Sequence, residues 1–343
     1  MDPKIERLDA RACTLATEHG PESDGTAVWD ATTMVIAEVR AAGVTGLGYT
    51  YVASAAAGVI RDVLAPVVVG GSARAIPAAM LAMRTAARNH GLTGLVACAI
   101  SAVDIALWDL KAKLASLPLA ELLGPARRRV PVRASGGFTS QTLDALAEEV
   151  AHYAATGHRR VKIKIGREPD RDLERVRVAR QAVGPRVELM VDANVYFEEP
   201  VSADDLDGLR VIRDRAPAGM AIAAGEYGCD ASYFRRMLDA GAVDILQADA
   251  TRACGITGFL QADALCAARS MPLSSHCAPA IHAHVDAAAT RIVHLEYFRD
   301  HARMEPELFD GVLSVDEGAL AYDSDRPGLG LVLRESEVRR HAA

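Results

Sequence analysis

The sequence lacks any apolar run of the ~18–20 residues that a membrane-spanning helix needs. Its first residues, MDPKIERLDARA, also lack the hydrophobic core of a signal peptide. We therefore expect no membrane partner and a cytoplasmic location.

Long runs of lysine and arginine are also absent, and the formal net charge is -7. Because nucleic-acid binding depends on clustered cations, no nucleic-acid partner is expected and a small-molecule substrate is. The six cysteines form no CxxC pair, which excludes the common zinc and redox patterns. We interpret them as small buried hydrophobic residues.

The composition indicates a globular protein with a large core, because 50% of the 343 residues are hydrophobic and 24% are charged. A single core rarely grows beyond ~250–300 residues, so the length predicts two domains. In residues 1–125, the alternation in TTMVIAEVR and the GVTGLG turn predict an antiparallel hairpin between Thr32 and Val52. Helical spacing over 75–89 and 95–123 completes a small α+β domain.

Beyond residue 125, short apolar strands alternate with helices. This alternation predicts a parallel sheet that closes into a barrel over residues 126–311, with a tail, 312–343, that returns to the first domain. The fold class is therefore α/β. The predicted helices cover 141–156, 170–183, 203–215, 230–240, 257–269 and 281–290.

The carboxyl ends of the predicted strands carry polar side chains, and barrel active sites are assembled at these ends. In sequence order they are Lys164, Asp192, Glu198, Glu226, Asp249 and His276. We expect the side chains of Lys162, Lys164, Asp192, Glu226, Asp249 and His276 to point into one cavity.

The segment VKIKIG places Lys162 and Lys164 on one strand face and apolar residues on the other. With the apolar face toward the helices, the lysines face the barrel interior. Two adjacent buried cations lower each other's affinity for a proton, which predicts a lysine that can accept a proton near pH 7. A solvated surface pair is the alternative.

Asp192, Glu198 and Glu226 each end a different strand. Oxygen ligands favour a hard cation such as Mg²⁺. Taken singly, each acid would be a loop cap or a solvated charge, but together they predict a metal site.

Asp249 and His276 end the next two strands. A carboxylate beside an imidazole fixes its tautomer and raises its basicity, as general-base chemistry requires. The alternative is a buried core histidine. Glu296, in HLEYF, is a candidate hydrogen-bond partner for a substrate oxygen or an ordinary cap.

The helical segment AISAVDIALWDLKAKLASLPLAELLG is followed in order by KIK, VDAN, FEEP, AAGE, QAD, GITG and SSH. Over nearly its whole length the chain resembles the mandelate racemase subgroup of the enolase superfamily, in the mandelate racemase/muconate lactonizing enzyme family. The resemblance implies a modified (β/α)7β TIM-type barrel with an N-terminal α+β capping domain. One departure is Cys254, where relatives usually have glycine.

The resemblance also implies the role of each site residue. Mg²⁺ would be held by Asp192, Glu198 and Glu226. Lys164 would be one acid/base group and the His276–Asp249 dyad the other. Lys162 would neutralise the substrate carboxylate, and Glu296 would hydrogen-bond the developing oxyanion.

These roles predict Mg²⁺-dependent removal of the proton next to a substrate carboxylate, through an enediolate. Dehydration of an acid sugar is favoured, because His276 can protonate the departing hydroxyl. Racemisation or epimerisation of a 2-hydroxy acid is the alternative. We also expect a homo-oligomer.

Substrate-contacting loops are expected around Glu22–Thr26 and Tyr49–Tyr51, and further contacts from Asn194 and Arg133. His282 and His284 form an HxH pair of the kind found in zinc hydrolases. In barrel hydrolases that pair is expected on the first strand, so its late position argues against this alternative.

The spacing between VDAN and FEEP is too short for a barrel. Only Val195, Tyr196 and Phe197 separate Asn194 from Glu198, whereas parallel neighbours need a crossover of about a dozen residues or more. We predict that roughly 20 residues are skipped here, with a chain break between about Asn194 and Tyr196. A true deletion would instead favour a non-catalytic homologue.

Overall fold

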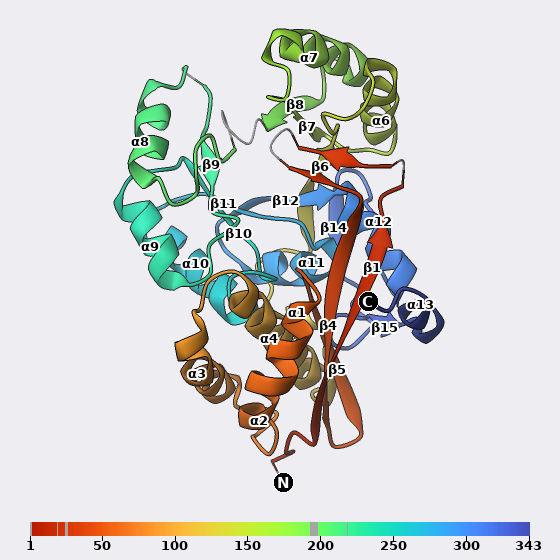
Figure 1. The fold of residues 1–343 in the computed structure, drawn as a ribbon, viewed down its shortest axis with the longest axis vertical. Helices are drawn as coiled ribbons and strands as arrows, with labels where there is room; N and C mark the ends of the chain where they lie inside the picture. Colours follow the sequence, from red (N-terminus) through yellow and green to blue (C-terminus); the bar gives the residue numbers. More distant parts are fainter. Residues whose placement is uncertain (1, 19, 25–26, 193–197, 218) are drawn as a thin grey trace.

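The computed structural model describes residues 2–18, 20–24, 27–192, 198–217 and 219–343. Long antiparallel strands and a group of helices form one part, and a curved parallel sheet with its helices forms the other (Figure 1). This arrangement confirms the predicted fold class, a capped TIM-type barrel.

The capping part contains a three-stranded antiparallel sheet with the strand order β1-β4-β5. Its strands are β1 (Arg7–Ala16), β4 (Ala31–Ala41) and β5 (Val44–Tyr51), and a small sheet pairs β2 (Glu22–Ser23) with β3 (Val28–Trp29). The predicted hairpin is confirmed as β4 and β5. The sequence did not indicate β1, in which arginine and aspartate interrupt a run of small apolar residues.

The helices of this part pack on the sheet. They are α1 (Ala55–Val59), the π-helical turn η1 (Ile60–Leu64), α2 (Ala65–Val68), α3 (Ile76–Ala87), the 3₁₀ turn η2 (Arg88–His90), α4 (Leu95–Leu114) and α5 (Leu119–Leu123). The GVTGLG segment is only partly a turn, because the chain reverses at Ala42 and Gly43, where φ is 51° and 76°. Gly46 and Gly48 lie within β5, where a Cβ would collide with the backbone of α4. These two glycines allow the close packing of helix on strand.

The parallel sheet has the strand order β8-β7-β6-β12-β11-β10-β9. Its strands are β6 (Arg129–Gly136), β7 (Arg160–Lys164), β8 (Glu188–Asp192), β9 (Ala223–Ala224), β10 (Ile245–Ala248), β11 (Leu273–Ser275) and β12 (Ile292–Phe298). Strand β14 (Ala319–Ala321) adds to β6 in the antiparallel direction.

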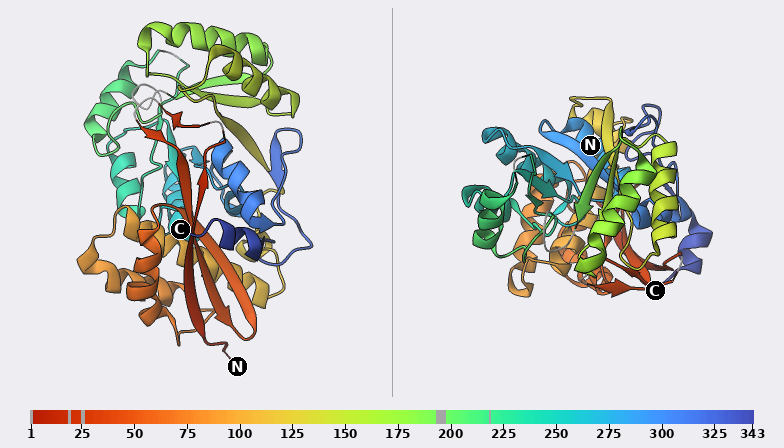
Figure 2. Two further views of the ribbon diagram at one scale, coloured as in Figure 1. Left: turned by 45° about the vertical axis from the view of Figure 1, so that its right-hand side comes forward. Right: turned by 90° about the horizontal axis from the view of Figure 1, so that it is seen from above.

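Helices alternate with these strands and surround them, as the view from above shows (Figure 2). They are α6 (Leu143–Ala155), α7 (Pro169–Val183), α8 (Leu206–Arg215), α9 (Ala231–Asp239), α10 (Gly255–Ala268), α11 (Pro279–Ala288) and α12 (Arg299–Leu308). The first six confirm the six predicted helices to within a few residues at each end.

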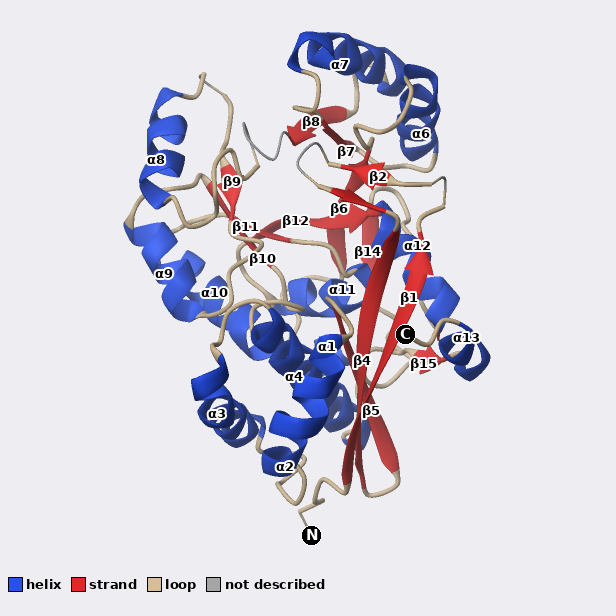
Figure 3. Cartoon of the chain, viewed as in Figure 1, coloured by secondary structure: helices blue, strands red, loops and turns tan. Residues whose placement is uncertain are grey.

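The sheet is open between β8 and β9, which among the described residues do not pair with each other (Figure 3). Glu198 makes one parallel bridge to Ala223, beside the edge strand β9. A cavity of about 440 Å³ lies at this opening and is lined from both sides, by Leu189 and Val191 of β8 and by Ala223 of β9. The predicted chain break itself falls on residues 193–197, outside the described part of the chain.

The C-terminal segment, which includes β13 (Phe309–Asp310), β15 (Val332–Leu333) and α13 (Glu335–Arg340), lies against the capping sheet (Figure 2). The backbone N–H of Thr14 donates to the carbonyl of His341, and Arg11 forms an ion pair with Glu335 at 2.8 Å. The domain boundaries near residues 125 and 311 stay predictions, as does homo-oligomerisation.

Asp109 of α4 joins the capping sheet to the C-terminal segment. Its buried carboxylate accepts hydrogen bonds from the N–H groups of Leu47, at 2.7 Å, and Leu329, at 2.6 Å, and pairs with Lys113 at 2.6 Å. Removing a buried acceptor leaves such donors without a partner, and each unpaired donor lowers the free energy of unfolding by about 1–3 kcal/mol.

We therefore expect Asp109→Ala to lower the free energy of unfolding by about 2–4 kcal/mol, since two backbone donors lose their partner. Urea unfolding followed by circular dichroism measures the change. Asp207→Ala is the matched control, because the Asp207 side chain is 90% exposed. Equal unfolding midpoints for the two variants would show that Asp109 does not hold these segments together.

Two further expectations concern the whole chain. Within the described ranges, no helix is both long and apolar enough to cross a membrane. All six cysteines are buried and free, which confirms their interpretation as small hydrophobic residues.

Candidate active site

The two lysines of β7 face the barrel interior, as predicted. Val161 and Ile163 are buried in a cluster with α6 and α7, so the alternation of the strand directs Lys162 and Lys164 to the opposite side. Lys162 is 2% exposed. The interpretation of these lysines as a solvated surface pair is therefore wrong.

Carboxylates surround Lys162. Its Nζ lies 2.8 Å from Asp192 Oδ2, 2.6 Å from Glu198 Oε1 and 2.6 Å from Glu296 Oε1. The Nζ of Lys164 donates to Asp192 at 2.5 Å. Four elements, β7, β8, β12 and the segment before α8, thus bring their charged side chains to one point.

The expected lowering of the lysine pKa is contradicted. Burial opposes the charged form of Lys164, but the charge of Asp192 outweighs it, so the pKa is raised above its ordinary value. The pKa of Lys162 is raised in the same way. The sequence correctly indicated two neighbouring cations, but an anion at 2.5–2.8 Å has a larger effect than a second lysine.

Arg133 of β6 belongs to the same charged group. Its guanidinium lies 3.3 Å from Glu198 and 3.2 Å from Glu296, and the side chain is 5% exposed. It was expected as a substrate contact. In the structure it neutralises two of the buried acids instead.

FEEP contains two acids, and the structure distinguishes them. Glu198 faces Lys162, whereas Glu199 accepts a hydrogen bond from the N–H of Gly225 at 3.0 Å. Burial, with Glu226 nearby, raises the pKa of Glu199 to about 8. Only the first acid of the motif joins the interior cluster.

The predicted dyad is present. His276 Nδ1 lies 2.9 Å from Asp249 Oδ2, and the other carboxylate oxygen accepts from the N–H and hydroxyl of Thr251, at 2.7 and 2.8 Å. Burial opposes the charge on His276, but Glu226 and Asp249 raise its pKa above the ordinary value. Asp249 has a pKa well below its usual range, because hydrogen bonding to His276 outweighs its burial.

Glu226 follows β9 and completes the cluster. Its carboxylate lies 3.2 Å from His276 Nε2 and 3.2 Å from Arg252. Sequence analysis missed Arg252, although it stands three residues beyond Asp249, in the loop after β10. Its cation lies between Glu226 and Asp249, 3.7 Å from the latter.

The three proposed metal ligands have the chemistry that Mg²⁺ prefers, since each offers carboxylate oxygens. Asp192 ends β8 and Glu198 precedes α8, and both are buried, whereas Glu226 follows β9 and is half-buried. They are not drawn tightly together. Lys162 lies between Asp192 and Glu198, and Glu226 faces His276 and Arg252. The residues fit the ion in type, and in this arrangement these basic side chains balance their charge.

The expected substrate contacts differ in their surroundings. Tyr49 is fully buried and donates its hydroxyl to Glu305 at 2.6 Å, which indicates a structural role. Tyr51 stacks on His301, with ring centroids 3.3 Å apart, and its hydroxyl has no hydrogen-bond partner among the described residues. Tyr51 is therefore the better candidate. Asn194 lies outside the described residues.

His282 and His284 are structural. Both lie on α11, where the N–H of Ala250 donates to His282 and the N–H of Ala120 donates to His284. Burial lowers the pKa of both rings, that of His284 to about 4. Within the described chain they share no close group of potential metal ligands, so the zinc-hydrolase alternative is wrong.

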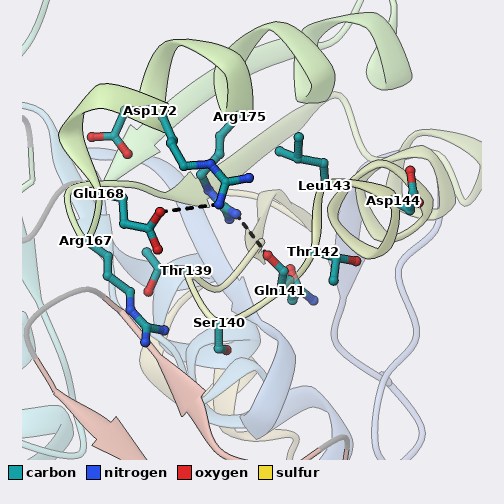
Figure 4. A pocket seen from close by; sticks show the side chains of 11 residues that line it. Thr139, Ser140, Gln141, Thr142, Leu143, Asp144, Arg167, Glu168, Asp172 and Arg175 are labelled. Atoms are coloured by element: carbon teal, nitrogen blue, oxygen red, sulfur yellow. Dashed lines mark hydrogen bonds and ion pairs between the residues drawn. The ribbon is translucent and has the colours of Figure 1, made fainter.

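The loop after β6 connects the capping part to the barrel. The N–H of Thr139 donates to the carbonyl of Ser23, and Trp29 packs edge-on against Phe138. Arg175 of α7 holds this loop by donating to the carbonyls of Gly137, Phe138 and Gln141. The same side chain lines a polar cavity of about 560 Å³ between the loops after β6 and β7 (Figure 4). None of the predicted catalytic side chains lines this cavity.

Known proteins resemble this chain over most of its length. A structure from Rubrobacter xylanophilus, of a mandelate racemase/muconate lactonizing enzyme-like protein, is 49% identical, with a TM-score of 0.97 over 99% of this chain and 100% of that one. L-talarate/galactarate dehydratase from Salmonella typhimurium is 32% identical over 333 residues, 89% of this chain and 82% of its own. A racemase from Streptomyces coelicolor, solved with bound magnesium, is 28% identical, with a TM-score of 0.92 over 99% of this chain and 100% of that one.

Two family models also match. The mandelate racemase/muconate lactonizing enzyme N-terminal domain covers residues 12–124, and the enolase C-terminal domain-like model covers 145–196 and 195–337. The chain therefore belongs to the mandelate racemase/muconate lactonizing enzyme family of the enolase superfamily.

Proposed function

We propose that the protein is a Mg²⁺-dependent lyase that removes the α-proton of an acid-sugar carboxylate and eliminates the β-hydroxyl as water. The observation that carries this proposal is the convergence of Lys164 and the His276–Asp249 dyad on one group of buried carboxylates. The dehydratase from Salmonella typhimurium, whose structure was solved with Mg, supports this choice. A small-molecule carboxylate is thus the expected partner.

Asp192, Glu198 and Glu226 would hold the ion, and Mg²⁺ would polarise the substrate carboxylate and offset the charge that develops on its oxygens. Lys162 and Arg133 supply further positive charge at this point. Lys164 is held as an ammonium by Asp192. Lys164 can act as a base once Asp192 binds the ion and no longer stabilises the ammonium. Ion binding would thus change the protonation state of Lys164.

Lys164 then takes the α-proton, and the electron pair of the broken C–H bond moves into the substrate carboxylate to give an enediolate. The enediolate returns this pair to form the carbon–carbon double bond as the β-carbon–oxygen bond breaks. His276, with Asp249 on Nδ1, donates its Nε2 proton to the departing hydroxyl, which leaves as water. Glu296 pairs with Lys162 and Arg133, which hold its pKa well below the ordinary value despite its burial, so it would have to take up a proton before it could donate a hydrogen bond to the substrate oxyanion. The enol product becomes a 2-keto-3-deoxy acid.

Screening an acid-sugar library with Mg²⁺ tests the proposal, with 2-keto acid formation as the readout. The same reactions in D₂O report exchange of the α-proton. A keto acid product supports dehydration, and exchange with an epimer but no keto acid assigns a racemase or epimerase. No exchange on any acid would overturn the proposal.

Removing the metal should abolish turnover. Because the enediolate dianion loses its main source of charge stabilisation, we expect a chelator to lower kcat more than ~100-fold, with recovery on adding Mg²⁺. Asp192→Asn should weaken Mg²⁺ activation, measured as the concentration for half-maximal rate. Asp207→Asn, an exposed acid on α8, is the control. Full activity in the chelator would contradict the metal assignment.

We also propose that the natural chain carries additional residues between Asn194 and Glu198. Among the described residues, β8 and β9 do not pair, so the barrel sheet is open there, and the match to the enolase C-terminal domain-like model is divided at residues 195–196. The intact mass of the protein from its native gene should exceed 36.4 kDa by the mass of roughly 20 residues. A mass equal to that of the printed sequence would establish a true deletion.

A further inference from the structure

Cys277 follows the dyad histidine and has no part in the proposed elimination. Cys277 and Ala278 both adopt left-handed backbone angles, with φ of 56° and 42°, which non-glycine residues rarely do. In this conformation Cys277 Sγ lies 3.2 Å from His276 Nε2, and the side chain is 2% exposed. The thiol is thus held against the nitrogen that would move the proton.

Glu296 provides a third donor from the neighbouring strand β12. Its Oε2 lies 3.9 Å from His276 Nε2, and the residue is 1% exposed. This oxygen accepts no hydrogen bond from any described residue, although the guanidinium of Arg133 lies 3.2 Å away. One nitrogen, one sulfur and one oxygen lie within 4.8 Å of one another.

This donor set suits a thiophilic cation. Zn²⁺ bonds of ~2.0–2.3 Å in a tetrahedron place the ligand atoms roughly 3.3–3.6 Å apart, close to the separations of 3.2 and 3.9 Å found here. Three protein ligands with one open position are typical of reactive zinc sites. Mg²⁺ prefers oxygen ligands, so the two ions would favour different members of the cluster.

We propose that His276, Cys277 and Glu296 form a second metal site, which takes Zn²⁺ or a similar soft divalent cation and inhibits the enzyme. On binding, the cysteine S–H bond and the Nε2–H bond of His276 break, both protons go to solvent, and bonds form from the metal to sulfur, to Nε2 and to the carboxylate oxygen. No group is oxidised or reduced. The inhibition rests on the proposed role of His276, because the metal would occupy its Nε2. The binding of the metal does not depend on that role.

A reactive or redox-sensing thiol is the competing interpretation of Cys277. Burial raises the pKa of this thiol well above its ordinary value, and reactive cysteines are exposed and have lowered pKa values. The other close group of possible ligands, Glu307, Glu337 and His341, is partly exposed, and Arg340 already pairs with both of its acids. The site beside His276 is therefore the stronger one.

Co²⁺ is the probe for the site, because cobalt bound to thiolate gives a charge-transfer absorption band in the near ultraviolet. The full protein, saturated with Mg²⁺, should develop this band on Co²⁺ titration and lose it when Zn²⁺ is added. Cys277→Ser should abolish the band. Cys266→Ala, which removes a buried thiol from α10, should retain it.

The second measurement is the Zn²⁺ concentration that halves the rate at saturating Mg²⁺. Each variant is compared with its own rate in the absence of Zn²⁺. Cys277→Ser should need at least ~10-fold more Zn²⁺ for half inhibition. Even the loss of a residue that only hydrogen-bonds a metal ligand lowers metal affinity about 10–100-fold. A wild-type protein without the thiolate band, or equal Zn²⁺ sensitivity in the two cysteine variants, would overturn the proposal. The absorption measurement needs no substrate, so its outcome is independent of the proposed elimination.

Discussion

Replacing Lys164 or His276 by alanine is expected to lower kcat by about 10²–10⁴-fold, the usual contribution of a positioned acid or base. Each side chain lies at the edge of the carboxylate cluster and is assigned one proton transfer. The two variants should fail at different steps. Lys164→Ala should lose α-proton exchange in D₂O, whereas His276→Ala should still exchange the proton and form little keto acid.

Measuring exchange and elimination on the same acid separates these defects. Circular dichroism verifies that the variants fold, and Lys4→Ala, which changes a lysine whose side chain is 64% exposed, is the control. If both variants retain the wild-type rate, the mechanism with two acid/base groups is wrong. If both lose exchange, His276 acts before the hydroxyl leaves, and its assignment as the acid is wrong.

Much of the barrel could be predicted from local patterns. The alternation in VKIKIG predicts which face of β7 is buried, because side chains alternate along any strand. The same reasoning placed Asp192, Asp249 and His276 at strand ends, where parallel topology brings them together. These inferences need only the order of elements along the chain.

The protonation state of the lysines could not be predicted from the sequence. It depends on whether Asp192 lies 2.5 Å or several ångströms from Lys164, and side-chain packing sets that distance. The roles of Arg133 and Arg252 were missed for the same reason. No motif marks a guanidinium that bridges two acids from other strands, and loop residues such as Arg252 have no periodic pattern.

The GVTGLG segment shows a related limit. Its glycines suggested a turn, but Gly46 and Gly48 are required by Ala106 and Ala102 of α4, which lie more than fifty residues further along the chain. Glycine at a turn and glycine at a close contact look alike in a sequence. Only the packed structure distinguishes them.

Replacing Asp249 by asparagine should have the second large effect. Because Thr251 donates to Oδ1, the amide oxygen would take that position, and the NH₂ would face His276 Nδ1 and favour the wrong tautomer, a change that costs up to ~10⁴-fold in kcat in a Ser-His-Asp triad. We expect a loss of similar order here, while the fold is retained because Thr251 can still donate to the amide oxygen.

The pH profile provides a sharper test of this residue. His276 must be protonated to donate to the departing hydroxyl, so the rate falls as pH rises through its pKa. Burial lowers that pKa, but Glu226 and Asp249 raise it above the ordinary value. The Asp249→Asn substitution would remove one of these two charges, which moves the alkaline limb of kcat to lower pH.

Asp286→Asn is the matched control, because burial raises the pKa of Asp286 far above its usual range and its hydrogen-bond partner is Ser275. If the alkaline limb stays in place in Asp249→Asn, this carboxylate does not set the pKa of His276. A fall in kcat would then reflect the orientation of the imidazole alone.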